Sequence, residues 1–135
     1  MTGHAGTFPA RLEAFAHVVA FVESVCAGAG VGRDGCLRLV LVVEELFVNT
    51  VVHGHGGDCD APVQLTVDPQ PGGIRVIYED QAPRFDPSAG PHDVPNAHEG
   101  PPGGHGLLLV RRFSSDLEYS RAGGANRVTF VIAGR

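Results

Sequence analysis

The sequence predicts a mixed α/β domain in which helices cover one face of a largely antiparallel sheet. Two observations predict this class. The stretch at residues 37–53 (LRLVLVVEELFVNTVVH) is apolar on nearly every side and long enough for a buried helix. Beyond it, short segments that alternate apolar and polar residues occur in two pairs, as antiparallel strands do. The predicted order is helix, helix, strand, strand, loop, helix, strand, strand, which gives an α+β two-layer sandwich.

Length and composition indicate one folded domain over residues 1–135, with 43% hydrophobic and 19% charged residues. The net charge of -5 provides no attraction for nucleic acid or an anionic membrane, so neither partner is expected. All ten basic residues are Arg, so a cationic contact to phosphate must come from Arg, backbone N–H groups or a metal. The three cysteines lack a C-x-x-C spacing, and we find neither a signal-peptide pattern nor an apolar run of membrane-span length. We therefore expect a cytoplasmic protein.

The N-terminal third is predicted to be helical after a short, frayed start of about ten residues. Pro9 suits the first turn of a helix. From Leu12 to Cys26 apolar residues recur at helical spacing, so we expect an amphipathic helix that ends near Gly28 or Gly30. A loop over residues 30–35 should then lead into the central helix.

The central helix carries one polar stripe. Arg38, Glu45, Asn49 and His53 are spaced 7, 4 and 4 residues apart and so share a helix face. Buried polar groups need polar partners. The stripe therefore indicates a cleft for a charged ligand, or else an internal hydrogen-bond network or an exposed face.

The rest of the chain is predicted from alternation and from turn residues. The glycines after His53 predict a loop. The later elements are strands at 63–67 and 74–80 around a turn at 68–73, a long loop at 81–104, a helix at 107–113, and a hairpin of 117–121 and 126–132. The long loop is rich in Pro, Gly, Asp and His, and its length favours a functional lid.

Three motifs carry the candidate chemistry. The first is Glu45-x-x-x-Asn49, with His53 one turn further on. The second is residues 79–87 (EDQAPRFDP), where a carboxylate ends a buried strand face. The third is residues 103–110 (GGHGLLLV), where glycines lead into a helix N-terminus. Each motif is common by itself, but their order and spacing are specific together.

In this order the motifs resemble the GHKL, or Bergerat-fold, ATP-binding domains, in their anti-sigma-factor serine-kinase branch. The resemblance runs from about Arg11 to the C-terminus. Glu45 and Asn49 match the N box, residues 80–87 match the first glycine box, and residues 104–109 match the second.

Two departures and one further match complete the resemblance. Ala82 stands where the first box usually has glycine, and Arg84 stands where the residue is often small. A methyl group there is expected to narrow the approach of backbone to base. The closing strand of the family often has a Thr that faces the base, and Thr129 is the candidate.

The resemblance implies a role for each motif. Asp80 would accept a hydrogen bond from the adenine amino group and repel the carbonyl of guanine. Asn49 would offer its amide oxygen to Mg²⁺, and Glu45 would be the general base. Gly104 and Gly106 would let backbone N–H groups face the phosphates. The other residues expected to bind ATP are His53, Ala82, Phe85, His105, Leu107, Leu108 and Thr129.

The function that the resemblance implies is an ATP- and Mg²⁺-dependent serine/threonine protein kinase. It would phosphorylate a serine on a small antagonist protein of the anti-anti-sigma type and bind a sigma factor or similar regulator. The resemblance also allows the domain to form a homodimer. The alternative is a nucleotide-binding interaction module without phosphoryl transfer. The presence of Glu45 favours the kinase, whereas Ala82 and the unusual long loop leave the module open.

A second cluster has the residue types of metal ligands: His53, His55, Asp58, Cys59 and Asp60. Glycines surround it, and no second Cys or His pair follows at the spacing of a zinc finger. We therefore favour a polar loop that caps the central helix. The histidines of the long loop, His92, His98 and His105, are expected to be solvated.

Overall fold

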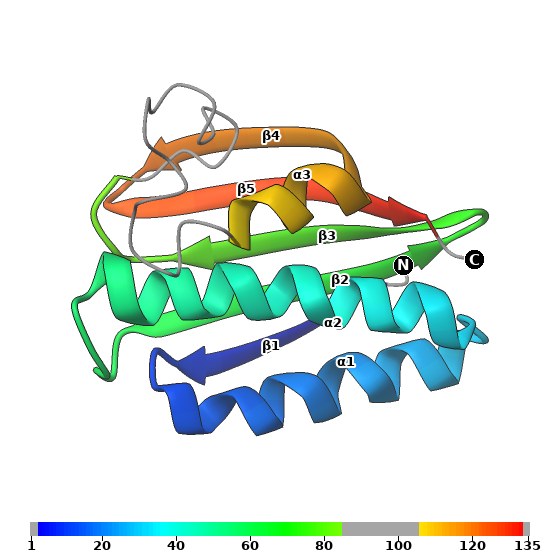
Figure 1. Ribbon diagram of the computed structural model, residues 1–135, viewed down its shortest axis with the longest axis horizontal. Helices are drawn as coiled ribbons and strands as arrows, with labels where there is room; N and C mark the ends of the chain where they lie inside the picture. Colours follow the sequence, from blue (N-terminus) through cyan, green and yellow to red (C-terminus); the bar gives the residue numbers. More distant parts are fainter. Residues whose placement is uncertain (1–2, 85–105, 134–135) are drawn as a thin grey trace.

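The computed structural model describes residues 3–84 and 106–133. It has helices on one face of a five-stranded sheet whose strand pairs are all antiparallel, so the predicted fold class is confirmed (Figure 1). The spatial order of the strands is β1 (His4–Pro9), β2 (Pro62–Gln70), β3 (Gly73–Asp80), β5 (Ala125–Ala133) and β4 (Ser114–Ala122). Most of the predicted lid lies outside the described residues.

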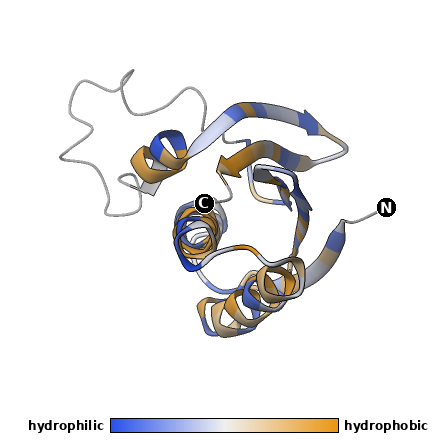
Figure 2. Cartoon of the chain, turned by 90° about the vertical axis from the view of Figure 1, so that its right-hand side faces the viewer, coloured by the Kyte–Doolittle hydropathy of each residue, from blue (hydrophilic) through white to orange (hydrophobic). Residues whose placement is uncertain are grey.

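Three α-helices lie on the same side of the curved sheet (Figure 2). They are α1 (Phe15–Ala29), α2 (Arg33–Val48) and α3 (Gly106–Phe113). A 3₁₀ turn at Leu12–Ala14 precedes α1, and a π-helical segment at Asn49–Gly54 continues α2. The predicted central helix is therefore confirmed, with its last six residues wound as a π-helix, a conformation often found at functional sites.

The expectation of a frayed N-terminus is wrong. His4–Pro9 forms an edge strand that pairs with β2, with Phe8 opposite Val63. The Phe8 ring packs edge-on against Phe21 of α1, with 5.8 Å between the ring centroids. Pro9 ends this strand instead of opening a helix. Because this strand pairs with a segment far along the chain, the sequence of residues 4–9 by itself gives little indication of a strand.

Two predicted loops are shorter than expected. Gly30 ends α1 in the left-handed region with φ of 73°, as predicted, but α2 already begins at Arg33. The turn predicted at 68–73 reduces to its tip, because β2 continues to Gln70 and β3 begins at Gly73. Gly72, with φ of 82°, makes this tight reversal.

The core lies between the helices and the sheet. Alternate residues of the three central strands face the helices and are buried, including Leu65, Val76 and Phe130. Phe47 of α2 is fully buried and stacks obliquely on Phe15, with 5.7 Å between ring centroids. This packing holds α2 against the sheet, so its last turns lie beside the end of β3.

One helical stretch, Leu12–Ala29, is long and apolar enough to cross a membrane by length and composition, contrary to the sequence-based expectation. Val18, Val22 and Cys26 of this stretch are buried in the core of the domain. A core helix meets the same length and hydropathy criteria, so they are weak evidence for a membrane span.

Candidate functional site

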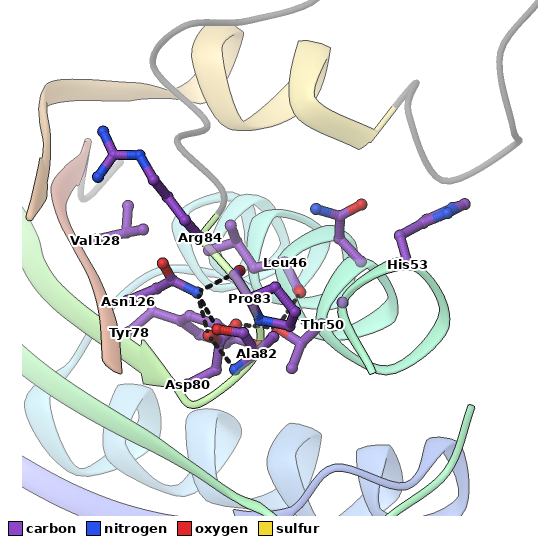
Figure 3. Close-up of a pocket in the computed structure, with 12 residues that line it drawn as sticks. Leu46, Thr50, His53, Tyr78, Asp80, Ala82, Pro83, Arg84, Asn126 and Val128 are labelled. Carbon is purple, nitrogen blue, oxygen red and sulfur yellow. Dashed lines mark hydrogen bonds between the residues drawn. The ribbon is translucent and has the colours of Figure 1, made fainter. Parts of the chain in front are cut away.

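A cavity of about 120 Å³ opens between the end of α2, the end of β3 and the start of β5 (Figure 3). Its polar wall includes Asn49, Asp80 and Asn126, and its apolar wall includes Leu46 and Val128. The structure therefore brings the second half of the N box and the start of the first glycine box into one cavity.

Asp80 lies at the base of this cavity with only 8% of its surface exposed. Among the described residues, three groups donate to its carboxylate. The Thr50 hydroxyl is 2.6 Å from Oδ2, while the Asn126 amide and the Ala82 N–H are 2.8 Å and 3.2 Å from Oδ1. A buried carboxylate is stable only with such donors, so these contacts fix its orientation.

The Thr50 hydroxyl links Asp80 to Tyr78. Thr50 Oγ1 lies 2.7 Å from the Tyr78 hydroxyl and 2.9 Å from the Leu46 carbonyl oxygen. A hydroxyl has one hydrogen, and the charged Asp80 oxygen is its nearest acceptor, so Thr50 donates to Asp80 and Tyr78 donates to Thr50. Burial raises the pKa of Tyr78 and keeps that donor protonated.

Ala82 forms part of the cavity wall and is buried, with 2% of its surface exposed. Its methyl group faces Gly54, the last residue of the π-helical segment. A Cβ at position 54 would lie 2.6 Å from the Ala82 Cβ, well inside normal contact distance. The alanine in the first glycine box is therefore accommodated by a glycine on the neighbouring helix.

Glu45 lies one turn before Asn49 on α2 and is not among the residues that line the cavity. Its Oε1 is buried and has no hydrogen-bond partner among the described residues. Burial raises the pKa of the Glu45 carboxyl to about 7, the charge of Glu44 adds to this, and the Val110 backbone opposes it by hydrogen bonding. Glu45 is thus a carboxyl close to α3 that can accept a proton near neutral pH.

The other predicted site residues are not all brought together. His53 lines the cavity but is exposed, and Figure 3 shows it at the edge, directed away from Asp80. Leu108 on α3 is 54% exposed and does not line the cavity, while Gly106 is the first residue of that helix. The predicted contributions of Phe85, Gly104 and His105 lie outside the described residues, as does the side chain of Leu107.

Thr129 does not face the cavity, so its predicted contact to the base is corrected. Asn126, Val128 and Phe130 point toward the helices and are buried, and strand alternation places Thr129 on the opposite face of the sheet. Asn126 takes the place at the cavity that we expected Thr129 to occupy.

The residues of the polar stripe on α2 have two different roles. At its start, Arg38 Nη2 donates to the Ala133 carbonyl oxygen over 3.1 Å and so binds α2 to the end of β5. At its end, Asn49 is 7% exposed and lines the cavity. Thr50 and Tyr78 also line the cavity, although neither was predicted as a site residue. Tyr78 had a signal in the sequence, because it shares the strand face of Asp80.

The loop after α2 contacts the N-terminal 3₁₀ turn. The Asp58 carboxylate accepts the Leu12 N–H over 2.9 Å, and Asp60 pairs with Arg11 at 2.7 Å. Within the described residues no three His, Cys, Asp or Glu side chains form a group that could hold a metal ion. These carboxylates therefore join two segments of the fold.

A family model, the histidine kinase-like ATPase domain, matches residues 8–132. The chain belongs to this family. A relative within the curated proteins, the serine/threonine-protein kinase BtrW of Bordetella bronchiseptica, is 30% identical over 95 residues, which cover 69% of this chain and 67% of BtrW. The predicted resemblance to the GHKL domains, in their anti-sigma-factor serine-kinase branch, is confirmed.

A solved structure has the same fold. It contains the RsbU and RsbW domains of Rv1364c from Mycobacterium tuberculosis and matches with a TM-score of 0.68 at 17% identity. The match covers 98% of this chain but only 32% of the other. The chain therefore spans about a third of that solved protein, and the likeness concerns the fold alone.

Proposed function

We propose that the chain binds ATP with its adenine in the cavity at Asp80 and transfers the terminal phosphate to a serine of a partner protein. The observation that carries this proposal is the number of hydrogen-bond donors that already contact the Asp80 carboxylate. A carboxylate offers about four acceptor positions. Three donors use Asp80 in the described structure, which leaves roughly one acceptor for a ligand N–H.

That single acceptor suits adenine and not guanine. The adenine amino group is a donor, whereas guanine has a carbonyl oxygen at the same ring position. An oxygen facing the Asp80 carboxylate would place two acceptors together without a hydrogen, at a buried site where unpaired polar groups are costly. The small volume of the cavity, about 120 Å³, fits the base end of a nucleotide better than a whole one.

The residues present also fit Mg²⁺. Asn49 is the cavity residue whose amide oxygen could bind a hard cation, because the Asp80 carboxylate is already held by three donors. When bound, Mg²⁺ would neutralise phosphate charge. Magnesium commonly retains waters and phosphate oxygens as ligands, so one protein oxygen is sufficient.

Glu45 is the proposed general base. Its carboxyl, with a pKa of about 7, is close to the value that serves proton transfer best at neutral pH. It would accept the proton of the attacking serine hydroxyl. Because Glu45 lies one helical turn from Asn49, base and metal ligand would act on adjacent parts of the same phosphate.

The proposed partners follow from the family branch. We infer a serine-bearing antagonist of the anti-anti-sigma type as phosphate acceptor and a sigma factor or similar regulator as binding partner, in the cytoplasm. The name of BtrW, a serine/threonine-protein kinase, supports the phosphoryl-transfer part of this proposal.

The second candidate function is a nucleotide-binding interaction module without phosphoryl transfer. It is favoured by the position of Glu45, which does not line the cavity, and by the Ala82 methyl group in the cavity wall.

Variants of α2 separate the two functions. Asn49→Ala should abolish both ATP binding with Mg²⁺ and phosphoryl transfer. Glu45→Ala should leave ATP affinity nearly unchanged and lower the transfer rate by roughly 10²–10⁴-fold, the usual contribution of a general base. Glu23→Ala, at an exposed position of α1, is the matched control and should alter neither property. If wild type binds ATP but transfers no phosphate to any candidate antagonist, and Glu45→Ala behaves in the same way, the interaction-module function is correct and the kinase function is refuted.

A further inference from the structure

A row of polar side chains crosses three strands beside the cavity. Asp80 on β3 lies directly opposite Asn126 on β5, and Asn126 lies directly opposite Arg121 on β4. Tyr119, two residues before Arg121, points to the same side of β4. Asn126 is therefore flanked by the site carboxylate on one strand and by two hydrogen-bond donors on the other.

The contacts of Asn126 determine which way its amide points. Arg121 Nη1 and the Tyr119 hydroxyl lie 2.9 Å and 2.6 Å from one atom of the amide, and since arginine can only donate, that atom is the oxygen. The other atom lies 2.8 Å from Asp80 Oδ1, which can only accept, so it is the nitrogen.

The Asn126 nitrogen also holds the backbone that follows Asp80. It lies 3.0 Å from the carbonyl oxygens of both Ala82 and Pro83 (Figure 3). Arg121 Nη1 donates to the Ala82 oxygen over 3.1 Å. One amide therefore fixes both the carboxylate and the turn of the first glycine box. Since Asn126 is 4% exposed, water cannot easily replace these contacts.

We infer that Asn126, clamped by Tyr119 and Arg121, is a positioning residue that directs the remaining acceptor of Asp80 into the cavity and so sets the preference for a 6-aminopurine. This inference rests on the proposed ATP site. Tyr119 and Arg121 do not line the cavity, and their hydrogen bonds reach it through Asn126 and the Ala82 backbone. The Tyr119 ring also lies against Arg84, which does line the cavity.

Tyr119→Phe is the sharpest test, because it removes one hydroxyl and keeps the ring beneath Arg84, whose guanidinium carbon is 5.2 Å from the ring centroid. Calorimetric titration with Mg-ATP and Mg-GTP gives the affinity ratio. We expect Tyr119→Phe to weaken ATP binding by about 2- to 10-fold, as for one lost hydrogen bond, with GTP affinity little changed. Asn126→Ala should shift the ratio further in the same direction. Arg127→Ala, on the outer face of β5, is the control and should keep the wild-type ratio.

Circular dichroism and thermal melting separate positioning from folding. A folded Asn126→Ala or Tyr119→Phe protein that keeps the wild-type ATP:GTP affinity ratio overturns the inference, even where its affinity for both nucleotides falls. A second contradicting result would be a changed ratio in Thr129→Val, on the outer face of β5, with no change in the Asn126 and Tyr119 variants. If Asn126→Ala does not fold, Tyr119→Phe decides. Wild type that binds ATP and GTP equally or not at all refutes the proposed function itself, whereas a selective wild type with unchanged variants refutes only the clamp.

Discussion

The contact between Gly54 and Ala82 predicts that these two positions are strongly coupled. Gly54→Ala would place a Cβ 2.6 Å from the Ala82 Cβ, about 1 Å inside the usual carbon–carbon contact of roughly 3.5–4.0 Å. Such overpacking costs about 1–3 kcal/mol of unfolding free energy. Alanine in a helix gains roughly 0.5–1 kcal/mol over glycine, so the net loss should be about 0–2.5 kcal/mol.

The same substitution should behave differently once the opposing methyl group is gone. In the Ala82→Gly background no Cβ opposes position 54, so Gly54→Ala should be neutral or stabilise the fold by up to about 1 kcal/mol. The coupling between the two positions is then about 1–3 kcal/mol, equal to the steric cost. Ala82→Gly alone should lose roughly 1 kcal/mol, because a buried methyl group is removed.

Urea denaturation of the four proteins of this cycle measures the coupling. Gly28→Ala provides a matched control, since Gly28 is also helical and an added Cβ there meets no atom within 4 Å. It should stabilise the protein by about 0.5–1 kcal/mol. Effects at positions 54 and 82 that add within roughly 0.5 kcal/mol would refute the steric reasoning.

Four further predictions concern the site and its surroundings. The transfer rate should rise with pH and level off above about 7, because the pKa of Glu45 is raised from 4.5 to about 7 by burial; a midpoint near 4.5 in the rate profile would contradict this. The same raised pKa contributes stability that is complete below pH 4.5 and lost as pH rises through about 7, so Glu45→Gln should flatten that part of the stability profile measured by urea denaturation. Thr50→Val should cost about 1–3 kcal/mol in urea denaturation, since it removes the acceptor of the Tyr78 hydroxyl and one of the three donors to Asp80, and an unchanged midpoint would remove the assigned Tyr78–Thr50–Asp80 chain. Asp60→Asn should leave the melting temperature nearly unchanged, because water screens its exposed pair with Arg11, and a clear drop would show that this loop contact is structurally important.

The central helix and the strand that ends in Asp80 could be predicted because their signals are local. Residues 37–53 are apolar over more than four turns, and alternation before Asp80 marks a half-buried strand. The edge strand His4–Pro9 could not be predicted in this way. Its pairing with β2, which begins only at Pro62, defines it, and the contact between Phe8 and Phe21 adds to this.

The closing strand shows a different limit. Its existence was predicted, but the face that each residue presents depends on register, and a shift by an odd number of residues reverses every side chain. Thr129 therefore lies on the outer face, and Asn126, three residues earlier, reaches the cavity. The fit of Ala82 against Gly54 is likewise a contact between distant segments, so the sequence showed the departure in the glycine box without showing how it is accommodated.

The most direct test of the account is nucleotide choice at Asp80, measured by titration calorimetry in the presence of Mg²⁺. Wild type should bind ATP and ADP and should bind GTP far more weakly. Asp80→Asn should weaken ATP binding by at least roughly 1 kcal/mol, because a charged acceptor is replaced by a neutral amide. Equal affinities for ATP and GTP in the wild-type protein, or full ATP affinity in Asp80→Asn, would show that the cavity at Asp80 is not the adenine site.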